Sequence, residues 1–464
     1  MSEYWYSRWL FERSLAAIYL VAFIAAALQF VPLLGEHGLE PVGRWVQNVP
    51  FLASPSLFYF LPRDYAFGAA AWLGIGLSLL ALSSWPQRMG APAAAAVWAA
   101  LWALYLSFVN IGQTFYGFGW ETLLCEVGFF AIFAGASRSS PNMILIWIWR
   151  WTLFRLMFGA GLIKLRGDSC WRDLTCLDYY FETQPMPNPL SWYFHWMPHG
   201  VHAAGVVVNH FVEVVVPFAY FAPQPLASIA GIVTILFQGV LIVSGNLSWL
   251  NWLTLVLCIP LIGDKRLAWL PIRPPADAPA APAYSSAMFF VAAGVGLLSL
   301  GPVLNMLSPR QMMNASFEPL HLVNTYGAFG SVTRERYEIV VEGTDEEVIT
   351  ENTTWRPYEF KGKPTDPARR PPEVAPYHLR LDWLMWFEAM ASRPQSEWFF
   401  NLLESLQQGD QQTLTLLRTN PFPGAPPRHV RAQYYLYRFT TPEEHRQDGL
   451  WWNRRLVGTF FGPV

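Results

Sequence analysis

Residues 142–163 read NMILIWIWRWTLFRLMFGAGLI, and residues 164–176 continue as KLRGDSCWRDLTC. The first segment is mostly apolar and long enough to cross a bilayer as a helix, which takes about 20 residues. The second segment is polar and holds two of the four cysteines of the chain. Together they predict a membrane-spanning helix that ends in a loop at a membrane surface.

The rest of the chain contains eight more apolar runs of about this length, near residues 14–34, 65–84, 91–109, 118–136, 203–222, 226–245, 249–263 and 285–305. Inside lipid, every backbone polar group must be bonded within its own segment, so each run is expected to be helical. We therefore predict a bundle of about nine spanning helices, with an error of one or two.

Charged residues divide the chain into two parts. Of the 64 Asp, Glu, Lys and Arg residues, positions 1–305 hold 28 and the last 159 positions hold 36. This uneven distribution predicts a polytopic helical membrane domain at residues 1–305, embedded in the lipid bilayer, and a water-facing domain at residues 306–464. The net charge of −2 gives no general attraction to nucleic acid.

The second part shows the patterns of a small α+β domain. Polar and apolar residues alternate, as in strands, in RERYEIVVEGT, WRPYEFKGKP and AQYYLYRFTT. Between these segments, LDWLMWFEAMAS and EWFFNLLESLQQ carry apolar residues at helical spacing. The sequence has no phosphate-binding glycine loop, HExxH motif or nucleophile elbow there, which disfavours the common soluble enzyme classes.

Lysine and arginine residues near the ends of the runs indicate the orientation. With a cytoplasmic N-terminus, seven basic residues fall on inner segments and five on outer loops. An odd number of helices then places the cysteine loop and the C-terminal domain outside the cytoplasm. That side is oxidising, so we predict a structural disulfide between Cys170 and Cys176, with a redox-active pair as the alternative. A proline- and alanine-rich linker occupies residues 270–286.

Titratable side chains also occur within the apolar runs or at their ends: Glu121, Glu126, Arg150, Arg155, Lys164, His210 and Glu213. A charge at the centre of a spanning helix costs about 2.5–3.5 kcal/mol on translocon-based scales, so such groups usually face the bundle interior in pairs. One interpretation is that acids of the fourth and sixth helices neutralise bases of the fifth and hold the bundle together. The alternative is a substrate or catalytic site. The sequence favours the first interpretation.

Lys164 has two interpretations of its own. It could extend along the helix end, with its ammonium group among the lipid headgroups. It could also lie at the mouth of a cavity and act as a base with a lowered pKa. Gly159 and Gly161 precede it and would allow a neighbouring helix or a ligand to approach closely.

Three histidines follow the cysteine loop at helical spacing, namely His195, His199 and His202. Pro198 and Gly200 interrupt that helix, and no nearby cysteine or carboxylate completes a ligand set in the sequence. We predict no metal site and no cofactor.

Several long blocks resemble the lipase maturation factor family, among them GFGWETLLCEVGFFAIF, RLMFGAGLIKLRGDSCWRDLTCLDYYFETQPMPNPLSWYFH, VNTYGAFGSVTRERYEIVVEGT and PYHLRLDWLMWF. The resemblance runs nearly from end to end. It implies a multi-spanning protein of the endoplasmic reticulum membrane, with a C-terminal domain in the lumen that engages client proteins. In animals the founding members are needed for lipoprotein lipase and related dimeric lipases to fold and leave that compartment.

The chain departs from the animal pattern in two respects. It is short, rich in alanine and poor in lysine, which suggests a bacterial member in an inner membrane with a periplasmic C-terminal domain. The resemblance then does not identify the client, because bacteria lack the animal lipases. Animal members also carry extra cysteines around the stretch that reads YEFKGKPTDPARRPP here, where Gly362 and Pro371 stand, which puts any thiol role of this domain in doubt.

The block FGAGLIKLRGDSCW is also similar to one that reads roughly A-G-x-x-K-L-x-x-x-W in the membrane domain of vitamin K-dependent carboxylases. In those enzymes the lysine of the block serves as the base toward the reduced quinone. Lys164 matches that position.

We therefore predict a membrane-embedded factor that assists the folding or export of client proteins. Its candidate client contacts are aromatic residues of the C-terminal domain, Trp383, Trp386, Trp451 and Trp452. The alternative is a membrane enzyme in which Lys164 acts as a base on a quinone-like or lipophilic substrate. A transporter is disfavoured because no two matching halves with broken helices are present.

Overall fold

The computed structural model describes residues 4–135, 140–273 and 282–463. Within them, seven helical segments are long and apolar enough to cross a membrane. Five are single helices: α1 (Trp5–Leu34), α3 (Asp64–Leu82), α5 (Ala91–Ile111), α7 (Met143–Arg166) and α12 (Leu226–Ser244). The other two segments are composite. One joins α11 (His199–His210) to a π-helical and a 3-10 turn that reach Phe221, and the other joins α15 (Pro282–Leu298) to α16 (Leu300–Leu307).

Two predicted runs form shorter helices beside these seven. The run at 118–136 is α6 (Gly119–Ala131), and the run at 249–263 is α13 (Leu250–Cys258) with one further 3-10 turn. The expected nine spanning helices are therefore seven by length and composition in the described part of the chain, plus these two. The N-terminal ends of both short helices are covered by protein, because Trp120 of α6 donates to His378 of the C-terminal part and Trp249, which precedes α13, donates to the Trp120 carbonyl.

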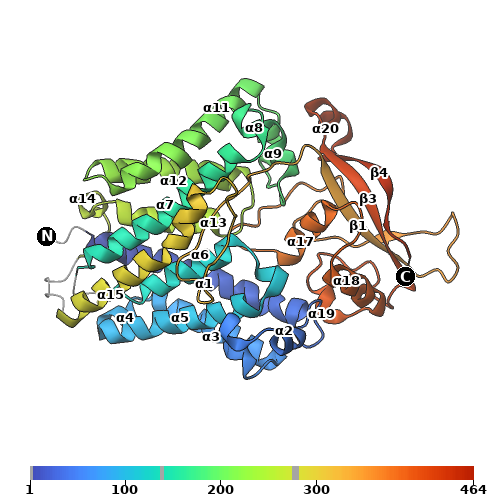
Figure 1. Ribbon diagram of the computed structural model, residues 1–464. Helices are drawn as coiled ribbons and strands as arrows, with labels where there is room; N and C mark the ends of the chain where they lie inside the picture. Colours follow the sequence, from blue (N-terminus) through green and yellow to red (C-terminus); the bar gives the residue numbers. More distant parts are fainter. Residues whose placement is uncertain (1–3, 136–139, 274–281, 464) are drawn as a thin grey trace.

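The bundle has two distinct ends, and Figure 1 shows the chain termini on opposite sides of the molecule. At the end that holds the N-terminus, the Asp264 carboxylate accepts the backbone N–H groups of Trp5 at 2.7 Å and Tyr6 at 3.0 Å. At the other end, the Gln29 side chain donates to Tyr377 and accepts from the Arg380 backbone N–H, each at 3.0 Å. The C-terminal domain therefore covers one end of the bundle.

Packing inside the bundle relies on large side chains against small ones. α7 lies at its centre, and 72% of its most apolar window is buried. The side chain of Asn142 caps this helix by accepting the Ile144 N–H. In α3, Gly74 lies so close to the ring of Phe23 that any side chain there would clash. Small residues of this kind let membrane helices approach closely.

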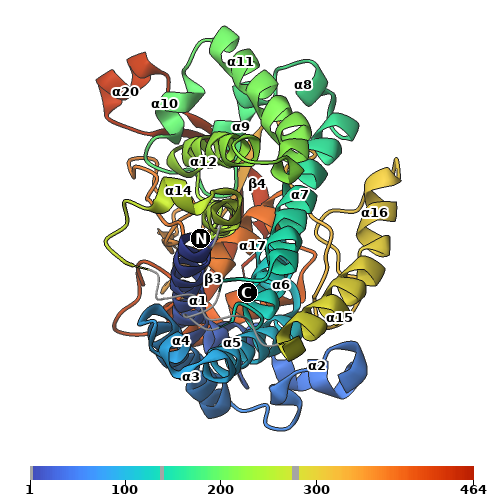
Figure 2. The same cartoon turned by 90° about the vertical axis from the view of Figure 1, so that its left-hand side faces the viewer.

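Short helices connect the long ones. They are α2 (Val42–Asn48), α4 (Trp85–Met89), α8 (Ser169–Arg172), α9 (Leu177–Thr183), α10 (Ser191–His195) and α14 (Asp264–Leu267). Figure 2 shows α15 and α16 at the edge of the bundle, beside α7. Residues 274–281 of the predicted linker lie outside the described residues.

The C-terminal domain contains one antiparallel sheet in the order β2-β1-β3-β4. Its strands are β1 (Arg336–Thr344), β2 (Arg356–Pro357), β3 (His429–Phe439) and β4 (Trp452–Phe461). The helices of the domain are α17 (Arg380–Ala389), α18 (Glu397–Gln408), α19 (Gln411–Leu414) and α20 (Pro442–Asp448). Two predicted strands and both predicted helices are thus confirmed, whereas the segment WRPYEFKGKP contributes only the two residues of β2. Figure 1 shows α17 between the sheet and the bundle.

Candidate functional site

The first buried ion pair lies in the centre of the bundle. Arg155 of α7 binds Glu126 of α6, and both side chains are almost wholly buried. The same carboxylate accepts the Asn324 backbone N–H at 3.0 Å and the Tyr326 O–H at 2.8 Å. It also accepts the Thr152 hydroxyl at 2.8 Å. The predicted charge neutralisation between the fourth and fifth helices is present. The same carboxylate also holds residues 324–326, which follow the last membrane helix, α16.

Glu121 pairs with the C-terminal domain and not with α7. Its carboxylate accepts Arg380 Nη1 at 2.7 Å and lies 3.4 Å from His378 Nδ1. The Tyr105 hydroxyl also donates to it. Burial lowers the pKa of His378 to about 4, so Arg380 is the cation of this group at neutral pH. The expectation that both acids of α6 serve the bases of α7 is therefore wrong for Glu121, because it lies in the first helical turn, at the end covered by α17.

Arg150 also differs from the expected pattern. Its guanidinium donates to the Tyr4 hydroxyl at 2.8 Å, to the Tyr220 carbonyl at 3.2 Å and to the Pro260 carbonyl at 3.3 Å. Its contacts are thus with hydroxyl and carbonyl groups at the bundle end that holds the N-terminus. A guanidinium has five N–H donors, so carbonyls at helix ends can satisfy it without a carboxylate.

Lys164 forms the second ion pair of α7, with Glu213 of the sixth predicted helix. Its Nζ donates to both carboxylate oxygens of Glu213, at 2.6 and 2.7 Å, and to Asn209 Oδ1 at 3.2 Å. The ammonium also lies 5.1 Å from the centre of the Trp171 ring. Lys164 is 4% exposed, so it is a buried, paired cation and does not extend to the lipid headgroups. His210 takes no part in this pair and instead contacts the Trp171 carbonyl through Nε2 at 2.9 Å.

A cavity of about 940 Å³ lies beside the Lys164–Glu213 pair. Its walls come from α7, α11, α12 and α13 of the bundle and from α17 and residues 326–333 of the C-terminal part. Most of the lining is apolar, and Lys164, Asn209 and Glu213 form a polar section of the wall. Lys164 therefore lines a cavity between the two parts of the protein, as one of its two interpretations requires.

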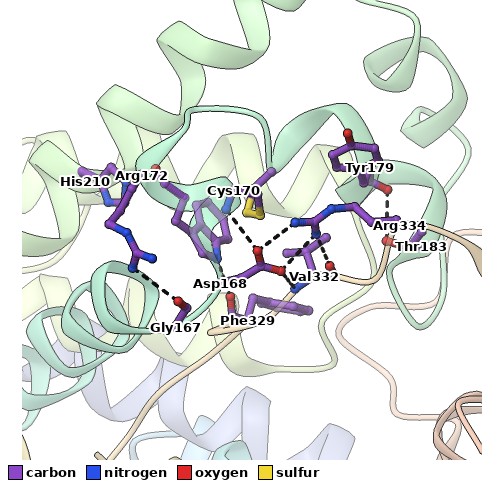
Figure 3. The surroundings of a disulfide bond; sticks show 12 residues. Gly167, Asp168, Cys170, Arg172, Tyr179, Thr183, His210, Phe329, Val332 and Arg334 are labelled. Carbon is purple, nitrogen blue, oxygen red and sulfur yellow. Dashed lines mark hydrogen bonds and ion pairs between the residues drawn. A yellow bond between two sulfur atoms is a disulfide. The ribbon is translucent and has the colours of Figure 1, made fainter. Parts of the chain in front are cut away.

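The cysteine loop fixes a third contact between the two parts. Cys170 and Cys176 form a disulfide, as predicted. Just before it, the Asp168 carboxylate caps α8 by accepting the Cys170 N–H at 3.0 Å and accepts Arg334 Nη2 at 2.8 Å (Figure 3). Hydrogen bonding from Arg334 holds the pKa of Asp168 at about 2. The loop is thus joined to residues just before β1, a contact that no local sequence pattern indicates.

The three histidines do not form a metal site. His199 and His202 both contact the Asp178 carboxylate, at 2.9 and 2.7 Å, and His195 lies 3.7 Å from Glu182. Among the described residues, no group of three or more His, Cys, Asp or Glu side chains could hold a metal ion.

The four candidate client-contact tryptophans differ in exposure. Trp383 and Trp452 are buried, the first beside the Trp120 ring and the second stacked on Phe439, so both pack inside the protein in this conformation. Trp386 donates to the Thr183 carbonyl and is half-buried. Trp451 is also half-buried and lies 5.0 Å from the Arg370 guanidinium. Only the latter two present surface.

Arg336 is a contact residue that the sequence reasoning missed. It begins β1, is buried, and donates to the carbonyls of Glu182 and Pro185, each at 3.0 Å, while pairing with Glu338. Lys363 lies 2.9 Å from the second oxygen of the same carboxylate. The signal was a pair of charged residues, Arg336 and Glu338, at alternate positions of a strand that is otherwise largely apolar.

Family models and relatives match almost the whole chain. Residues 6–269 match the family model described as lipase maturation factor transmembrane domain, and residues 322–462 match lipase maturation factor C-terminal domain. The chain is 42% identical to lipase maturation factor 1 of Bos taurus, over 99% of this chain and 89% of that protein. It is 41% identical to lipase maturation factor 1 of Homo sapiens, with 99% and 88% covered. It is 30% identical to lipase maturation factor 2 of Xenopus laevis, with 100% and 83% covered. No solved structure matches the chain.

Proposed function

Because the chain belongs to the lipase maturation factor family, we propose that it is a membrane-embedded factor that assists the folding of secreted lipases. We place the C-terminal domain, residues 306–464, in the lumen of the endoplasmic reticulum of a eukaryote. In a bacterium, which the composition suggests, the equivalent side is the periplasmic face of the inner membrane.

The observation that carries this proposal is the way in which the C-terminal domain is held. Glu121 and Glu126 of α6 and Asp168 beside α8 each bind polar groups that follow the last membrane helix. Charge-assisted hydrogen bonds of this kind fix orientation as well as distance. The domain would therefore present its outer surface to clients at a constant height and angle above the membrane.

Trp451 is the candidate client contact that fits this role best. It is half-buried, adjoins β4, and packs with His445 of α20 and with Trp192 and Tyr193 of α10. Tryptophan is enriched among residues that dominate binding energies at protein interfaces. A matched control is Trp269, which is 77% exposed and follows α14 at the opposite end of the molecule.

The test uses cells that lack their own lipase maturation factor 1 and that express lipoprotein lipase. Expression of the full chain should restore the secretion of active lipase. A photo-crosslinking amino acid at position 451 should capture the lipase, whereas the same group at position 269 should not. Failure to restore secretion, or equal capture at both positions, would overturn the proposal.

The enzymatic alternative rests on Lys164 alone. In the structure, this lysine is the cation of a buried ion pair with Glu213, which favours a structural role over that of a general base. The alternative predicts that Lys164→Met/Glu213→Gln, which removes both charges together, abolishes maturation while the protein still expresses and unfolds at an unchanged temperature. Retained maturation in this variant would rule the alternative out.

A further inference from the structure

Residues 49–62, which read VPFLASPSLFYFLP, connect α2 to α3 and leave large apolar side chains uncovered. Leu52 is 83% exposed and Phe60 is 78% exposed. Three further side chains of the segment are more than 40% exposed, namely Phe51, Leu57 and Leu61. The ring centres of Phe51 and Phe60 lie 5.8 Å apart, so the two ends of the segment contribute to one surface. A contiguous apolar patch of this kind marks a contact with another protein or with a membrane.

The rest of the segment is attached to the bundle. Ser56 Oγ donates to the Ser107 carbonyl at 2.9 Å, and Asn110 Nδ2 donates to the Pro55 carbonyl at 2.8 Å. Phe58 is buried, with its ring centre 4.9 Å from that of Phe108. Helix α5 provides all three of these partners. The segment is therefore a fixed part of the fold, with an attached part and an uncovered part.

The contact with α5 also sets the depth of the segment. This helix ends at Ile111 on the side of the C-terminal domain, where Asn110 Nδ2 also donates to the Pro319 carbonyl at 3.0 Å. Ser107 lies four residues before that end. At a rise of about 1.5 Å per residue, the segment reaches roughly 6 Å from the helix end toward the middle of the bundle. The apolar faces of interfacial helices are buried to a similar depth, about 5–10 Å, at the boundary between headgroups and acyl chains.

The charges on either side of the segment agree with this placement. No charged residue lies between Arg44 and Arg63 in the sequence. Both arginines form exposed ion pairs, Arg44 with Glu397 of α18 and Arg63 with Glu36. Such pairs stay in water, because moving a charge into hydrocarbon is unfavourable. The segment itself is not a continuous helix, and irregular backbone that faces lipid is excluded from the hydrocarbon region, so the segment belongs at the interface.

The uncovered side chains continue the lipid-facing surface of α3. This helix begins at Asp64, directly after the segment, and only 28% of its most apolar window is buried. Tyr65, Trp72 and Leu73 of α3 are each more than 50% exposed. A surface that continues one facing lipid is covered by the bilayer itself, whereas a client protein or a second copy of the chain would have to displace lipid to reach it.

We propose that residues 49–62 form an interfacial anchor, which inserts Leu52, Phe60 and their apolar neighbours into the leaflet on the side of the C-terminal domain. Its partner is the phospholipid bilayer, at the level of the headgroups and the first acyl carbons. The anchor also positions the C-terminal domain. Asn401 of α18 donates to the Leu39 carbonyl, just before α2, at 2.8 Å, and Glu397 of the same helix pairs with Arg44. The anchor therefore holds the α18 side of the domain near the membrane surface.

The test measures the depth of labelled positions in vesicles. An environment-sensitive fluorophore is attached to Leu52→Cys or Phe60→Cys, and to two controls. Leu73→Cys lies midway along α3, and Val348→Cys replaces a 70% exposed apolar residue in the loop between β1 and β2. The free cysteines Cys125 and Cys258 are buried, and the parent chain measures their background labelling. The full chain is reconstituted in phosphatidylcholine vesicles that carry a nitroxide quencher either near the headgroup or near the end of the acyl chain, and iodide on both sides serves as the quencher in water.

At positions 52 and 60 we expect emission shifted to shorter wavelength, strongest quenching by the nitroxide near the headgroup, and little quenching by iodide. Position 73 should be quenched most by the nitroxide near the chain end, and position 348 by iodide alone. Both anchor variants should unfold at the temperature of the parent, because the replaced side chains are exposed. If iodide quenches positions 52 and 60 as strongly as position 348, the segment lies in water, free for a protein partner, and the proposal is wrong. Protection from iodide and from both nitroxides would show that protein covers the segment and would equally refute it.

Discussion

Glu182 is a single residue whose burial makes the stability of the protein depend on pH. It lies on α9, and its carboxylate accepts the Phe439 N–H at 2.6 Å. Burial raises its pKa to about 7 from the usual 4.5. Burial also lowers the pKa of the neighbouring His195 to about 4, so the histidine is neutral over the same range. The folded protein is therefore most stable when Glu182 is protonated, because burial disfavours the charged carboxylate by more than the Phe439 hydrogen bond favours it.

The sign of the pH effect follows from this raised pKa. Between pH 4.5 and 7 the unfolded chain releases the proton of Glu182 while the folded protein keeps it, so the free energy of unfolding falls as the pH rises. The pKa difference of 7 − 4.5 = 2.5 units, at about 1.4 kcal/mol per unit, amounts to on the order of 3 kcal/mol.

Glu182→Gln keeps an oxygen that can accept the Phe439 N–H and removes the ionisation. We expect the variant to be more stable than the parent by on the order of 3 kcal/mol at pH 8 and equally stable at pH 4.5. Denaturant unfolding at half-unit steps of pH measures the difference between the two proteins, in which the contribution of His195 largely cancels. A constant difference across this range would contradict the prediction.

The intramembrane charges show how far single residues can be interpreted from sequence. Glu126 with Arg155 and Glu213 with Lys164 join helices that the hydropathy pattern predicts, so their pairing followed from electroneutrality inside a bundle. Glu121 did not follow this rule, because its cation, Arg380, lies 259 residues away in the other part of the chain. No spacing rule spans that distance.

At the scale of elements, the sequence predicted those with a clear periodicity and missed the edges. β1 and β3, which the sequence predicted, are the central strands of the sheet. β1 is buried over almost its whole length, so its residues do not alternate in exposure. β4 was not predicted, because an edge strand has one solvated side and carries WNRRLVGTFF, with adjacent arginines and a glycine. The segment around β2 contains Pro357 and Pro364, which cannot donate to a strand ladder. β2 pairs with β1 only through Arg356 and Pro357, so the strand is two residues long.

The loop that contains the disulfide offers a test at this scale. Asp168 caps α8 and binds the backbone N–H of Val332 at 3.3 Å as well as the guanidinium of Arg334. Asp168→Ala removes all three contacts. We expect a loss of about 1–2 kcal/mol, since a helix cap alone is worth about 1 kcal/mol and Arg334 is partly solvated. Hydrogen exchange should become faster in residues 168–176 and 329–334.

Asp173→Ala is the matched control in the same loop. Its side chain is exposed, and substitutions at such surface positions usually change stability by less than about 0.5 kcal/mol. Faster exchange confined to residues 168–176, with residues 329–334 unchanged, would show that Asp168 does not join the loop to the C-terminal domain.

At the scale of the whole molecule, the charges that the membrane helices bury hold the soluble domain in place. Glu121, Glu126 and Lys164 each stand where helices of the bundle meet one another or the segments that follow the last helix. An apolar contact surface would hold two parts together over a range of angles, whereas hydrogen-bonded charges hold them at one. The apolar helices thus carry charged residues, despite the cost of desolvating them, because these residues fix the orientation of the C-terminal domain on the bundle.

Arg380 is the residue on which this docking depends most directly. It is fully buried at the start of α17, donates to Glu121 at 2.7 Å and to the Phe115 carbonyl at 2.8 Å, and lies 3.5 Å from the centre of the Tyr116 ring. Arg380→Met leaves the Glu121 carboxylate buried with a neutral histidine, and breaking a buried pair from one side costs about 3–5 kcal/mol. We expect the domain to detach from the bundle while its sheet stays folded. Trypsin should then cut at Arg310 and Arg334 before it cuts within β3.

The double variant Arg380→Met/Glu121→Gln separates loss of the ion pair from loss of packing. It leaves no unpaired charge, so most of the lost stability and the resistance to trypsin should return. Arg418→Met is the control. Arg418 is half-exposed, and its ion pair with Glu359 at the surface of the same domain is long, at 3.9 Å. It should behave as the parent. If Arg380→Met unfolds the sheet and the bundle together, or if the double variant is no more stable than the single one, the buried charge pair is not what holds the domain to the membrane part.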